Sequence, residues 1–296
     1  MAWRLGLDYT DRPMLRNTFC HLPGISAAAE ERLWSAGLRS WDDALGDAQI
    51  PLGPLQRQRL AQRLTESCRR LEARDAGHFA GALPSKQHWR LFPEFRDRIA
   101  YVDIETTGLN PMSSYVTTIA LYDGKRIRHY VRGDNLEQFG RDIDDYGLIV
   151  TYNGKCFDVP FLRASMGLRM DHAHIDLRYI LRALGYSGGL KGCERKLGLD
   201  RGDLEDVDGF MAVLLWEDYR SGGHPRSLET LLAYNIQDVV NLETLLVLAY
   251  NLRIASTPFA QSHRLPMPAA PRIPFRPDRD TIRRIRGSTW WGAPRW

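Results

Sequence analysis

The sequence predicts an α/β protein in which a mixed five-stranded sheet is flanked by helices. Two observations predict this fold. Residues 117–131 have the composition and the Asp-Gly turn of a β-hairpin, and further short apolar strands are separated by helices. A hairpin gives antiparallel neighbours and strand–helix–strand units give parallel ones, so the sheet is mixed. Apolar residues make up 44% and charged residues 26% of the 296 residues, as in soluble globular proteins.

The first third of the chain is predicted to be helical. Residues 25–38 place apolar side chains at helical spacing, and residues 52–77 form a longer amphipathic candidate. Residues 81–95 are expected to connect these helices to the sheet. We therefore divide the chain into a helical N-terminal region (1–94), a central domain (95–254) and a C-terminal tail (255–296).

Five strand candidates follow in the middle third. They are 99–102, the two arms of the hairpin at 117–131, 148–153 and 174–177. Helices are expected at 136–146 and directly after residue 158. The strongest helix candidate is 227–252, because its apolar residues are the most numerous and no glycine or proline interrupts it.

The C-terminal tail is predicted to be extended and basic. Residues 253–296 contain nine arginines and two acids, hold most of the late prolines and show little periodicity. The net charge of the chain is +4, although residues 99–252 carry 22 acidic against 16 basic side chains. Basic segments favour a polyanionic partner, and an acidic centre favours bound cations.

The composition also bears on the cellular compartment. No run of eighteen apolar residues is present, and residues 1–13 contain acids and lack the apolar stretch of a secretory signal. The four cysteines are scattered without a Cys-x-x-Cys pair, which fits a reducing compartment and gives no zinc cluster. We therefore expect a cytoplasmic protein.

Four carboxylates stand in contexts that indicate metal binding. Asp103 and Glu105 are two residues apart at the end of the first strand, so both point to one face. Asp158 follows a strand and a glycine turn and begins an apolar helix. Asp238 lies four residues after Tyr234 on an apolar helix, so these two share a face.

Acids that converge from three segments suit Mg²⁺ or Mn²⁺, and two such ions about 4 Å apart can cleave a phosphodiester bond. Tyr234 would then orient the attacking water, since its ordinary pKa near 10 makes it a poor base at neutral pH. Each acid alone also has an ordinary explanation as a strand-end acid, a helix cap or a solvated helix residue.

The segments "DIETTG" (103–108), "YNGKCFD" (152–158) and "YNIQD" (234–238) resemble the three motifs of the DnaQ-like 3′–5′ exonuclease superfamily, which has the ribonuclease H-like fold. The tyrosine four residues before the last acid resembles the tyrosine (DEDDy) branch. "TYNGKCFDVPFL", "HIDLRYILRALG" and "GGLKGCERKLGL" resemble the bacterial YprB-like group of predicted exonucleases. The resemblance covers about residues 95–252.

The resemblance implies a role for each matching residue. Two divalent cations, Mg²⁺ or Mn²⁺, would be held by Asp103, Glu105, Asp158 and Asp238, with Tyr234 orienting water. The pocket for the 3′-terminal nucleotide would be lined by Thr106, Thr107, Gly108 and Leu109. Asn153 and Lys155 are further substrate-binding candidates. A glycine turn lets backbone approach a substrate, and a leucine offers an apolar surface for a base.

Several polar residues keep two interpretations. Asp176 either supports the site or caps the next helix, and Asn153 either contacts substrate or serves its own turn. Lys155 and Lys191 either meet phosphate or lie on the solvated surface. His172 and His174 either bind metal or occupy a strand edge.

Residues 20–38 resemble a helix-hairpin-helix, with Pro23, Gly24 and Ile25 at the hairpin. Such hairpins bind DNA phosphates through backbone N–H groups at a helix N-terminus. Ser26 stands where the usual second glycine would be, so a purely structural hairpin is the alternative.

These observations favour a metal-dependent 3′–5′ exonuclease that acts on DNA 3′ ends, most simply single-stranded ones, in DNA repair with a helicase or other repair partner. One alternative keeps the chemistry with RNA as the substrate, since recognition of the ribose 2′-hydroxyl cannot be read from the residues. The other is a nucleic-acid-binding module with a vestigial nuclease centre. A complete set of four acids favours the enzyme.

Overall fold

Five strands form one mixed sheet in the order β3-β2-β1-β4-β5 in the computed structural model. The strands are β1 (Ile99–Thr106), β2 (Val116–Tyr122), β3 (Ile127–Val131), β4 (Leu148–Thr151) and β5 (Ala173–Asp176). β2 pairs antiparallel with β1 and β3, whereas β4 pairs parallel with β1 and β5. The mixed five-stranded sheet and the hairpin predicted from the sequence are confirmed.

The structure describes residues 14–46 and 53–289, so the expectation about a signal at residues 1–13 lies outside the described residues. The α-helices in the described part are α1 (Ala27–Ser35), α2 (Trp41–Leu45), α3 (Pro54–Glu72), α4 (Ala76–Ala82), α5 (Phe92–Phe95), α6 (Phe139–Ile143), α7 (Asp158–Met166), α8 (Leu177–Ala183), α9 (Gly189–Lys196), α10 (Gly209–Gly222), α11 (Pro225–Ile254) and α12 (Arg279–Thr289). Short 3₁₀ helices are η1 (Leu15–Asn17), η2 (Ser85–Leu91), η3 (Arg96–Arg98), η4 (Leu136–Gln138) and η5 (Gly202–Leu204).

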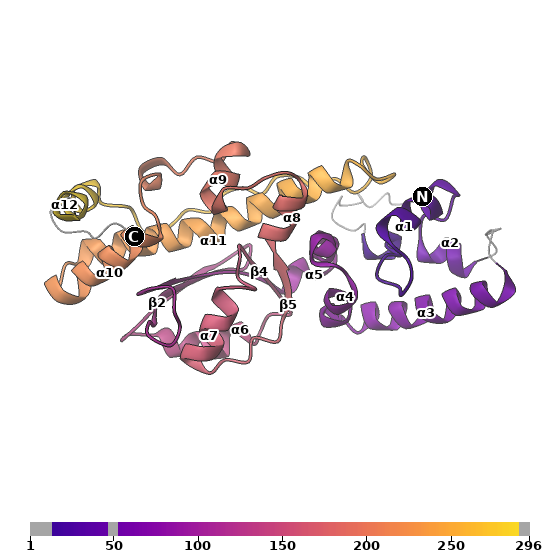
Figure 1. Ribbon diagram of the computed structural model, residues 1–296, viewed down its shortest axis with the longest axis horizontal. Helices are drawn as coiled ribbons and strands as arrows, with labels where there is room; N and C mark the ends of the chain where they lie inside the picture. The colour runs from indigo at the N-terminus through magenta and orange to yellow at the C-terminus, as the bar shows by residue number, and fades with distance from the viewer. Residues whose placement is uncertain (1–13, 47–52, 290–296) are drawn as a thin grey trace, which may run out of the picture.

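Helices cover both faces of the sheet. Figure 1 shows α11 crossing one face, with α8, α9 and α10 on the same side, and α6 and α7 on the opposite face. Along β1 the side chains alternate between two apolar clusters. Ile99 and Tyr101 pack on the α11 side, and Val102 and Ile104 pack on the α7 side. Asp103 and Glu105 occupy the odd positions that follow Tyr101, so β1 presents both acids to α11.

The long helix α11 is the core helix of the protein. It is long and apolar enough to cross a membrane, but 78% of its most apolar window is buried inside the protein. Leu242, Leu245 and Leu246 pack on the sheet, and Leu231 and Leu232 pack on α10. Packing in the core therefore accounts for its apolar composition.

The N-terminal region contains the predicted helices, which are α1 and α3 with somewhat shorter bounds. Gly24 has φ +86°, and the hydroxyl of Ser26 accepts from the Ala29 N–H and caps α1. The element before this hairpin is η1, a single 3₁₀ turn rather than an α-helix. Phosphate binding by the hairpin stays a prediction.

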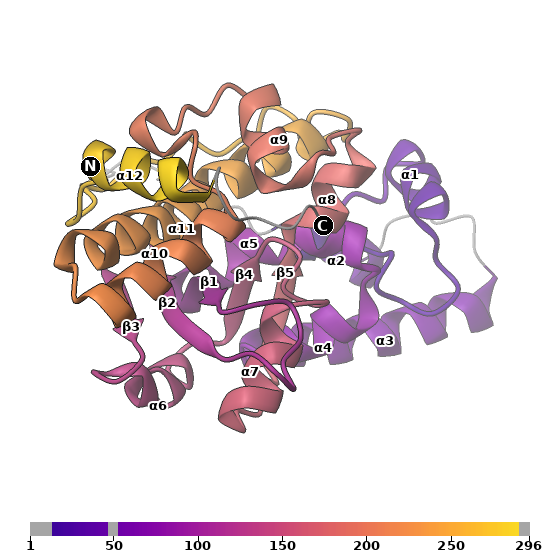
Figure 2. The same cartoon turned by 60° about the vertical axis from the view of Figure 1, so that its left-hand side comes forward.

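A buried ion pair joins this region to the connector before the sheet. Arg90 Nη2 lies 2.7 Å from Glu30 Oε2, and Glu30 Oε1 accepts from the backbone N–H groups of Phe19 and Cys20. Figure 2 shows α1, α2 and α3 at the far side of the molecule from α10 and α12. The three-part division of the chain stays a prediction from the sequence.

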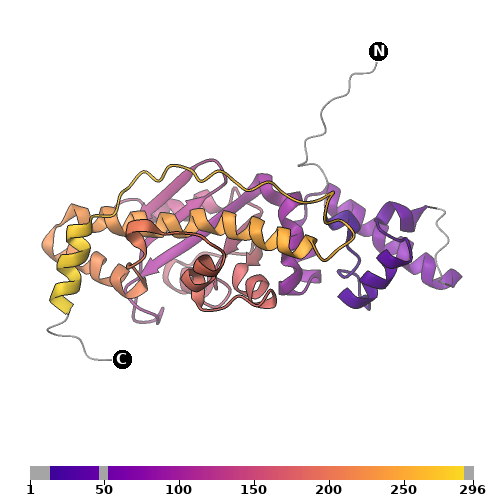
Figure 3. The same cartoon turned by 90° about the horizontal axis from the view of Figure 1, so that it is seen from above.

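The C-terminal tail departs from the expected extended segment at its end. Figure 3 shows the tail running back alongside α11 before it turns into α12. The prediction that the tail lacks regular structure is wrong for α12, where Ile282 and Ile285 are buried against α10 and α11. Its arginines pair with acids of the same chain: Arg284 contacts Asp218, and others contact Asp203 and Asp206. Much of the tail's positive charge is therefore used within the protein.

Candidate active site

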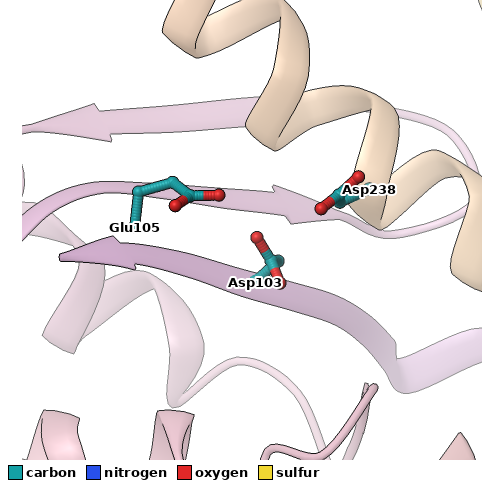
Figure 4. Close-up of side chains that lie close together, drawn as sticks. All are labelled: Asp103, Glu105 and Asp238. Atoms are coloured by element: carbon teal, nitrogen blue, oxygen red, sulfur yellow. The ribbon is translucent and has the colours of Figure 1, made fainter. Parts of the chain in front are cut away.

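Three carboxylates from two distant segments meet at the sheet surface. Asp103 and Glu105 on β1 and Asp238 on α11 each present an oxygen within 4.8 Å of the others. Figure 4 shows the three side chains pointing toward one another between the strand and the helix. Asp103 is partly buried, and the other two are buried. Sequence positions more than 130 residues apart thus form one acidic centre.

The pairing register between β1 and β2 shifts directly after the second acid. Glu105 pairs with Thr118 and Thr106 with Val116, so a bulge falls between Glu105 and Thr106. Bulges re-aim side chains and end strand pairing, and they are frequent beside active sites. The bulge therefore ends the strand directly after the second acid.

Asp158 reaches the site through a tight turn after β4. Gly154 is required there, because a Cβ at this position would lie 2.2 Å from Thr151 Oγ1. Asn153 adopts φ +69°, a left-handed conformation that asparagine tolerates better than most residues. Asp158 then begins α7. It lies outside the group of three carboxylates, but its charge contributes to raising the pKa of both Asp103 and Glu105.

Asp176 resolves into a structural role. Its carboxylate accepts from the backbone N–H groups of Asn153, Lys155 and Arg178, so it clamps the turn before Asp158 and caps α8. Asp176 therefore caps α8, as one interpretation expected, and also supports the turn that leads to Asp158, as the other did.

Tyr234 and Asn235 bring two polar groups of α11 to the acids. Burial and the charge of Asp238 raise the pKa of the Tyr234 hydroxyl, which therefore stays protonated. Asn235 Nδ2 donates to Asp103 Oδ2 at 2.7 Å, and Asn235 Oδ1 accepts from the Thr118 hydroxyl at 3.1 Å. The sequence prediction missed Asn235. Its only signal was a fully buried polar residue within an apolar helix, and burial is not visible in a sequence.

Arg201 is the second residue that the sequence prediction missed. Its guanidinium lies 2.5 Å from Asp238 Oδ1 through Nη2, and it contacts Glu194 at 2.5 and 3.0 Å through Nε and Nη2. Asn241 also donates to Glu194 at 2.7 Å. The centre of the guanidinium is 5.6 Å from the ring centroid of Tyr234. Arg201 precedes η5 in a loop without periodicity, so no local pattern pointed to it.

The electrostatics of the acids fit a divalent cation. Burial, together with Asp238, raises the pKa of Asp103 and of Glu105 well above the ordinary range. Burial raises the pKa of Asp158 to about 7 and that of Asp238 to about 6, although Arg201 opposes the shift at Asp238. Among the described residues, no basic side chain forms an ion pair with Asp103 or Glu105. A hard cation would remove this repulsion, and carboxylate oxygens are the ligands that Mg²⁺ and Mn²⁺ prefer.

The residues after Glu105 divide into buried and exposed ones. Thr106 is buried and donates to the Gly108 carbonyl at 2.7 Å, and the Thr107 hydroxyl accepts from the Tyr115 N–H. Leu109 is 86% exposed. The predicted nucleotide-binding segment is thus a hydrogen-bonded turn that carries an unpacked apolar side chain.

Asn153, Lys155 and Lys191 are engaged in contacts within the protein. The Asn153 side chain accepts from Arg178, and Lys155 Nζ donates to Ser85 Oγ at 3.2 Å. Lys191 Nζ donates to the carbonyls of Glu205 and Val207. It also lies 5.7 Å from the Tyr234 ring centroid, so it borders the acidic centre. The contacts of Lys155 lead toward η2 instead.

The two histidines bind protein atoms. His174 Nε2 lies 2.8 Å from the Thr151 hydroxyl on β4, and His172 Nε2 lies 3.0 Å from the Ile143 carbonyl. His174 lies on β5, an edge strand of the sheet, as one interpretation expected.

The family comparison agrees with this fold. Residues 100–250, about half of the chain, match the RNase_H superfamily. "Uncharacterized protein YprB" of Bacillus subtilis (strain 168) is 28% identical over 176 residues, which cover 51% of this chain and 42% of that protein. A family B DNA polymerase from Pyrobaculum calidifontis superposes with a TM-score of 0.40 and 18% identity over 57% of this chain and 27% of the polymerase. The chain therefore matches less than half the length of each of these two proteins.

Proposed function

Because this chain belongs to the RNase H superfamily, we propose that it is a metal-dependent 3′–5′ exonuclease of the tyrosine (DEDDy) type. Its substrate would be DNA 3′ ends, preferably single-stranded, and its setting cytoplasmic DNA repair. One observation carries the proposal. Asp103 and Glu105 from β1 and Asp238 from α11 present carboxylate oxygens within 4.8 Å of one another, and Glu105 and Asp238 are buried. A cluster of this kind is costly to fold, and it suits a nuclease metal centre.

The residues divide the work of such a centre. The cations would be held by Asp103, Glu105, Asp238 and, from the start of α7, Asp158. When bound, Mg²⁺ or Mn²⁺ would activate water for attack on phosphorus and stabilise the leaving oxygen. The protonated Tyr234 hydroxyl would orient the attacking water by a hydrogen bond. Asn235 fixes the orientation of Asp103 through Nδ2.

The turn after β1 would receive the 3′-terminal nucleotide. Its backbone is held by the hydroxyls of Thr106 and Thr107, so it is preorganised. Leu109 is exposed and would contact the base of the terminal nucleotide. A base that is not paired in a duplex is free to make this contact. This arrangement supports a preference for single strands.

The test is a cleavage assay on 5′-labelled single-stranded DNA, duplex DNA and RNA with Mg²⁺, Mn²⁺ or EDTA. Asp103→Asn and Asp238→Asn are compared with Glu94→Gln, which changes a buried acid that contacts Leu15 rather than the acidic centre. We expect a ladder of 3′-shortened DNA that disappears in EDTA and falls by about a thousandfold in both aspartate variants but not in the control.

Other outcomes identify the alternatives. Cleavage of RNA alone would replace the proposal by an exoribonuclease. Folded protein that binds DNA but cleaves none of the substrates with either metal would leave a binding module with a vestigial centre. Equal activity of Asp103→Asn and wild type would refute the assignment of the site.

A further inference from the structure

A polar cleft lies where β4 and β5 end. It is a cleft of about 780 Å³ lined by Tyr152, Asn153, Arg178, Arg182 and residues 185–189. The lining comes from the turn after β4, from α8 after β5, and from the start of α9. None of the residues assigned to the metal centre lines it, so it is a separate surface feature.

The cleft and the acids lie at the same end of the parallel strands. β4 runs parallel to β1 and to β5, so the carboxyl ends of all three strands lie on one side. Asp103 and Glu105 lie toward the end of β1, and the cleft begins where β4 and β5 end. Ligands of open α/β sheets bind outside the carboxyl ends of the strands.

In two chain segments, residues that line the cleft are followed closely by residues at the acidic centre. Asn153 in the cleft is in the turn that places Asp158 at the start of α7. Gly189 in the cleft begins α9, and two residues later Lys191 Nζ lies 5.7 Å from the ring of Tyr234. A strand whose 3′ end is at the acids can therefore continue into the cleft within a few nucleotides.

Two arginines and no acidic residue line the cleft. Arg178 and Arg182 are four residues apart on α8, so both are on one face, and both are exposed. Across residues 14–46 and 53–289, neither guanidinium forms an ion pair with a carboxylate, and that of Arg178 contacts the neutral side chain of Asn153. Arg284 on α12, by contrast, is paired with Asp218. The two arginines of the cleft are thus available to an anionic ligand.

The remaining lining suits a nucleic acid strand. Tyr152 and Tyr186 line the cleft and are partly buried against the core, and the part of an aromatic ring that lines a cleft can stack with a base without sequence preference. Gly185, Gly188 and Gly189 all have positive φ and carry no side chain, so ligand atoms can approach the backbone closely. Arginine pairs, aromatic rings and open backbone together are the composition of single-strand binding grooves.

We propose that this cleft binds the backbone phosphates of the nucleotides upstream of the 3′ end, with Arg178 and Arg182 as the phosphate ligands. The inference rests on the proposed nuclease function and adds the path of the substrate strand. It makes the preferred substrate a single strand several nucleotides long rather than a dinucleotide, because shorter substrates do not reach the arginines.

The test compares Arg178→Gln/Arg182→Gln with Arg126→Gln/Arg169→Gln. The control variant loses the same charge from exposed arginines in the β2–β3 turn and in the loop before β5. Both arginines lie at the amino ends of the parallel strands, away from the cleft. Two substrates are used: a single-stranded DNA oligonucleotide, and the p-nitrophenyl ester of thymidine 5′-phosphate, which has no upstream phosphates. Binding of the same oligonucleotide in EDTA is measured by fluorescence anisotropy.

We expect the cleft variant to lower the ratio of oligonucleotide to ester kcat/KM about tenfold, mainly through a higher KM. Two lost phosphate contacts should also reduce the slope of log affinity against log salt by about 1.4. The control variant should stay within about twofold of wild type in both measurements.

The proposal is overturned if the ratio and the salt slope of the cleft variant match those of wild type, or if the control variant shows the same losses. A parallel loss on both substrates would also overturn it, because the arginines would then act on the metal centre or the fold. If wild type cleaves neither substrate but binds the oligonucleotide in EDTA through the two arginines, the nuclease function is refuted and the cleft is retained.

Discussion

Replacing Arg201 by methionine tests how the acidic centre balances its buried charge. The Arg201 side chain is 1% exposed and is shared by two buried carboxylates, those of Glu194 and Asp238. Methionine keeps much of the length and apolar volume of the side chain but removes the cation. Arg201→Met therefore leaves two carboxylates buried without a positive partner.

The size of the effect follows from this geometry. Breaking a buried pair by removing one partner costs about 3–5 kcal/mol, because the remaining charge stays desolvated. That loss is a large part of the about 5–15 kcal/mol that stabilises a typical domain. Adding Glu194→Gln removes one stranded charge, and replacing both partners of a buried pair is often neutral. The double variant should therefore recover about half of the loss or more.

The matched control is the other buried arginine–glutamate pair, Arg90 with Glu30, which is 3% and 0% exposed. Arg90→Met should destabilise the protein to a similar degree. Urea unfolding is measured for both single variants and the Arg201→Met/Glu194→Gln variant, with and without Mn²⁺. A cation at 100 times its Kd stabilises the folded state by about 2.7 kcal/mol. We expect that gain in wild type and Arg90→Met, and a larger one in Arg201→Met, because the cation there also neutralises the Asp238 charge that Arg201 no longer compensates.

Two results would refute this reasoning. If Arg201→Met unfolds within about 1 kcal/mol of wild type, the pair is not the compensated buried charge that the distances indicate. If Mn²⁺ stabilises Arg90→Met and Arg201→Met equally, Arg201 supports the fold but does not compensate the charge of Asp238 at the cation site.

Three further predictions concern other contacts. Asn235→Leu removes the donor that holds Asp103, so calorimetry should show about tenfold weaker Mn²⁺ binding; unchanged affinity would contradict that role. Burial raises the pKa of Glu94 to about 8 from 4.5, so the folded state keeps a proton that the unfolded state releases, and stability falls as the pH rises from about 4.5 to 8. The melting temperature of Glu94→Gln should therefore rise relative to that of wild type as the pH increases across that range. A constant difference between the two melting temperatures would contradict the pKa shift. Arg284→Ala breaks two hydrogen bonds to Asp218 and should cost about 1 kcal/mol in urea unfolding, with less loss at high salt; an unchanged or salt-independent loss would contradict the ion pair.

The strands, the long helix and three of the acids follow from patterns that a sequence displays. The spacing of Asp103 and Glu105 sets their common face, and the four-residue spacing of Tyr234 and Asp238 sets theirs. Arg201 could not be found in this way, because its loop has no period and its partners are 7 and 37 residues away. Contacts of this kind depend on the tertiary fold.

The same reason explains why α12 was not predicted. Only Ile282 and Ile285 of this helix are buried apolar residues, which is too few to show a helical period among its arginines. Besides these two buried side chains, the helix forms ion pairs with acids that precede it by about 70 residues, such as Arg284 with Asp218 and Arg279 with Asp203. An excess of arginine that indicates a nucleic acid partner in a sequence can thus serve internal pairing in the fold. The cleft at Arg178 and Arg182, where such acids are lacking among the described residues, carries the nucleic acid argument better than the tail does.

The carboxylates of the acidic centre come from both β1 and α11, so the free-energy cost of burying them is divided between two elements. Asp103 and Glu105 extend a strand whose other residues are buried on both faces, and Asp238 lies on a helix with a continuous apolar core surface. Each element is stabilised by packing elsewhere along its length, so it can tolerate one or two unfavourable carboxylates. Compensation is also uneven, because Arg201 pairs with Asp238 while Asp103 receives only the neutral donor Asn235. The negative charge without a cationic partner is therefore on the β1 side of the centre. A divalent cation bound on that side would have the most favourable electrostatic interaction.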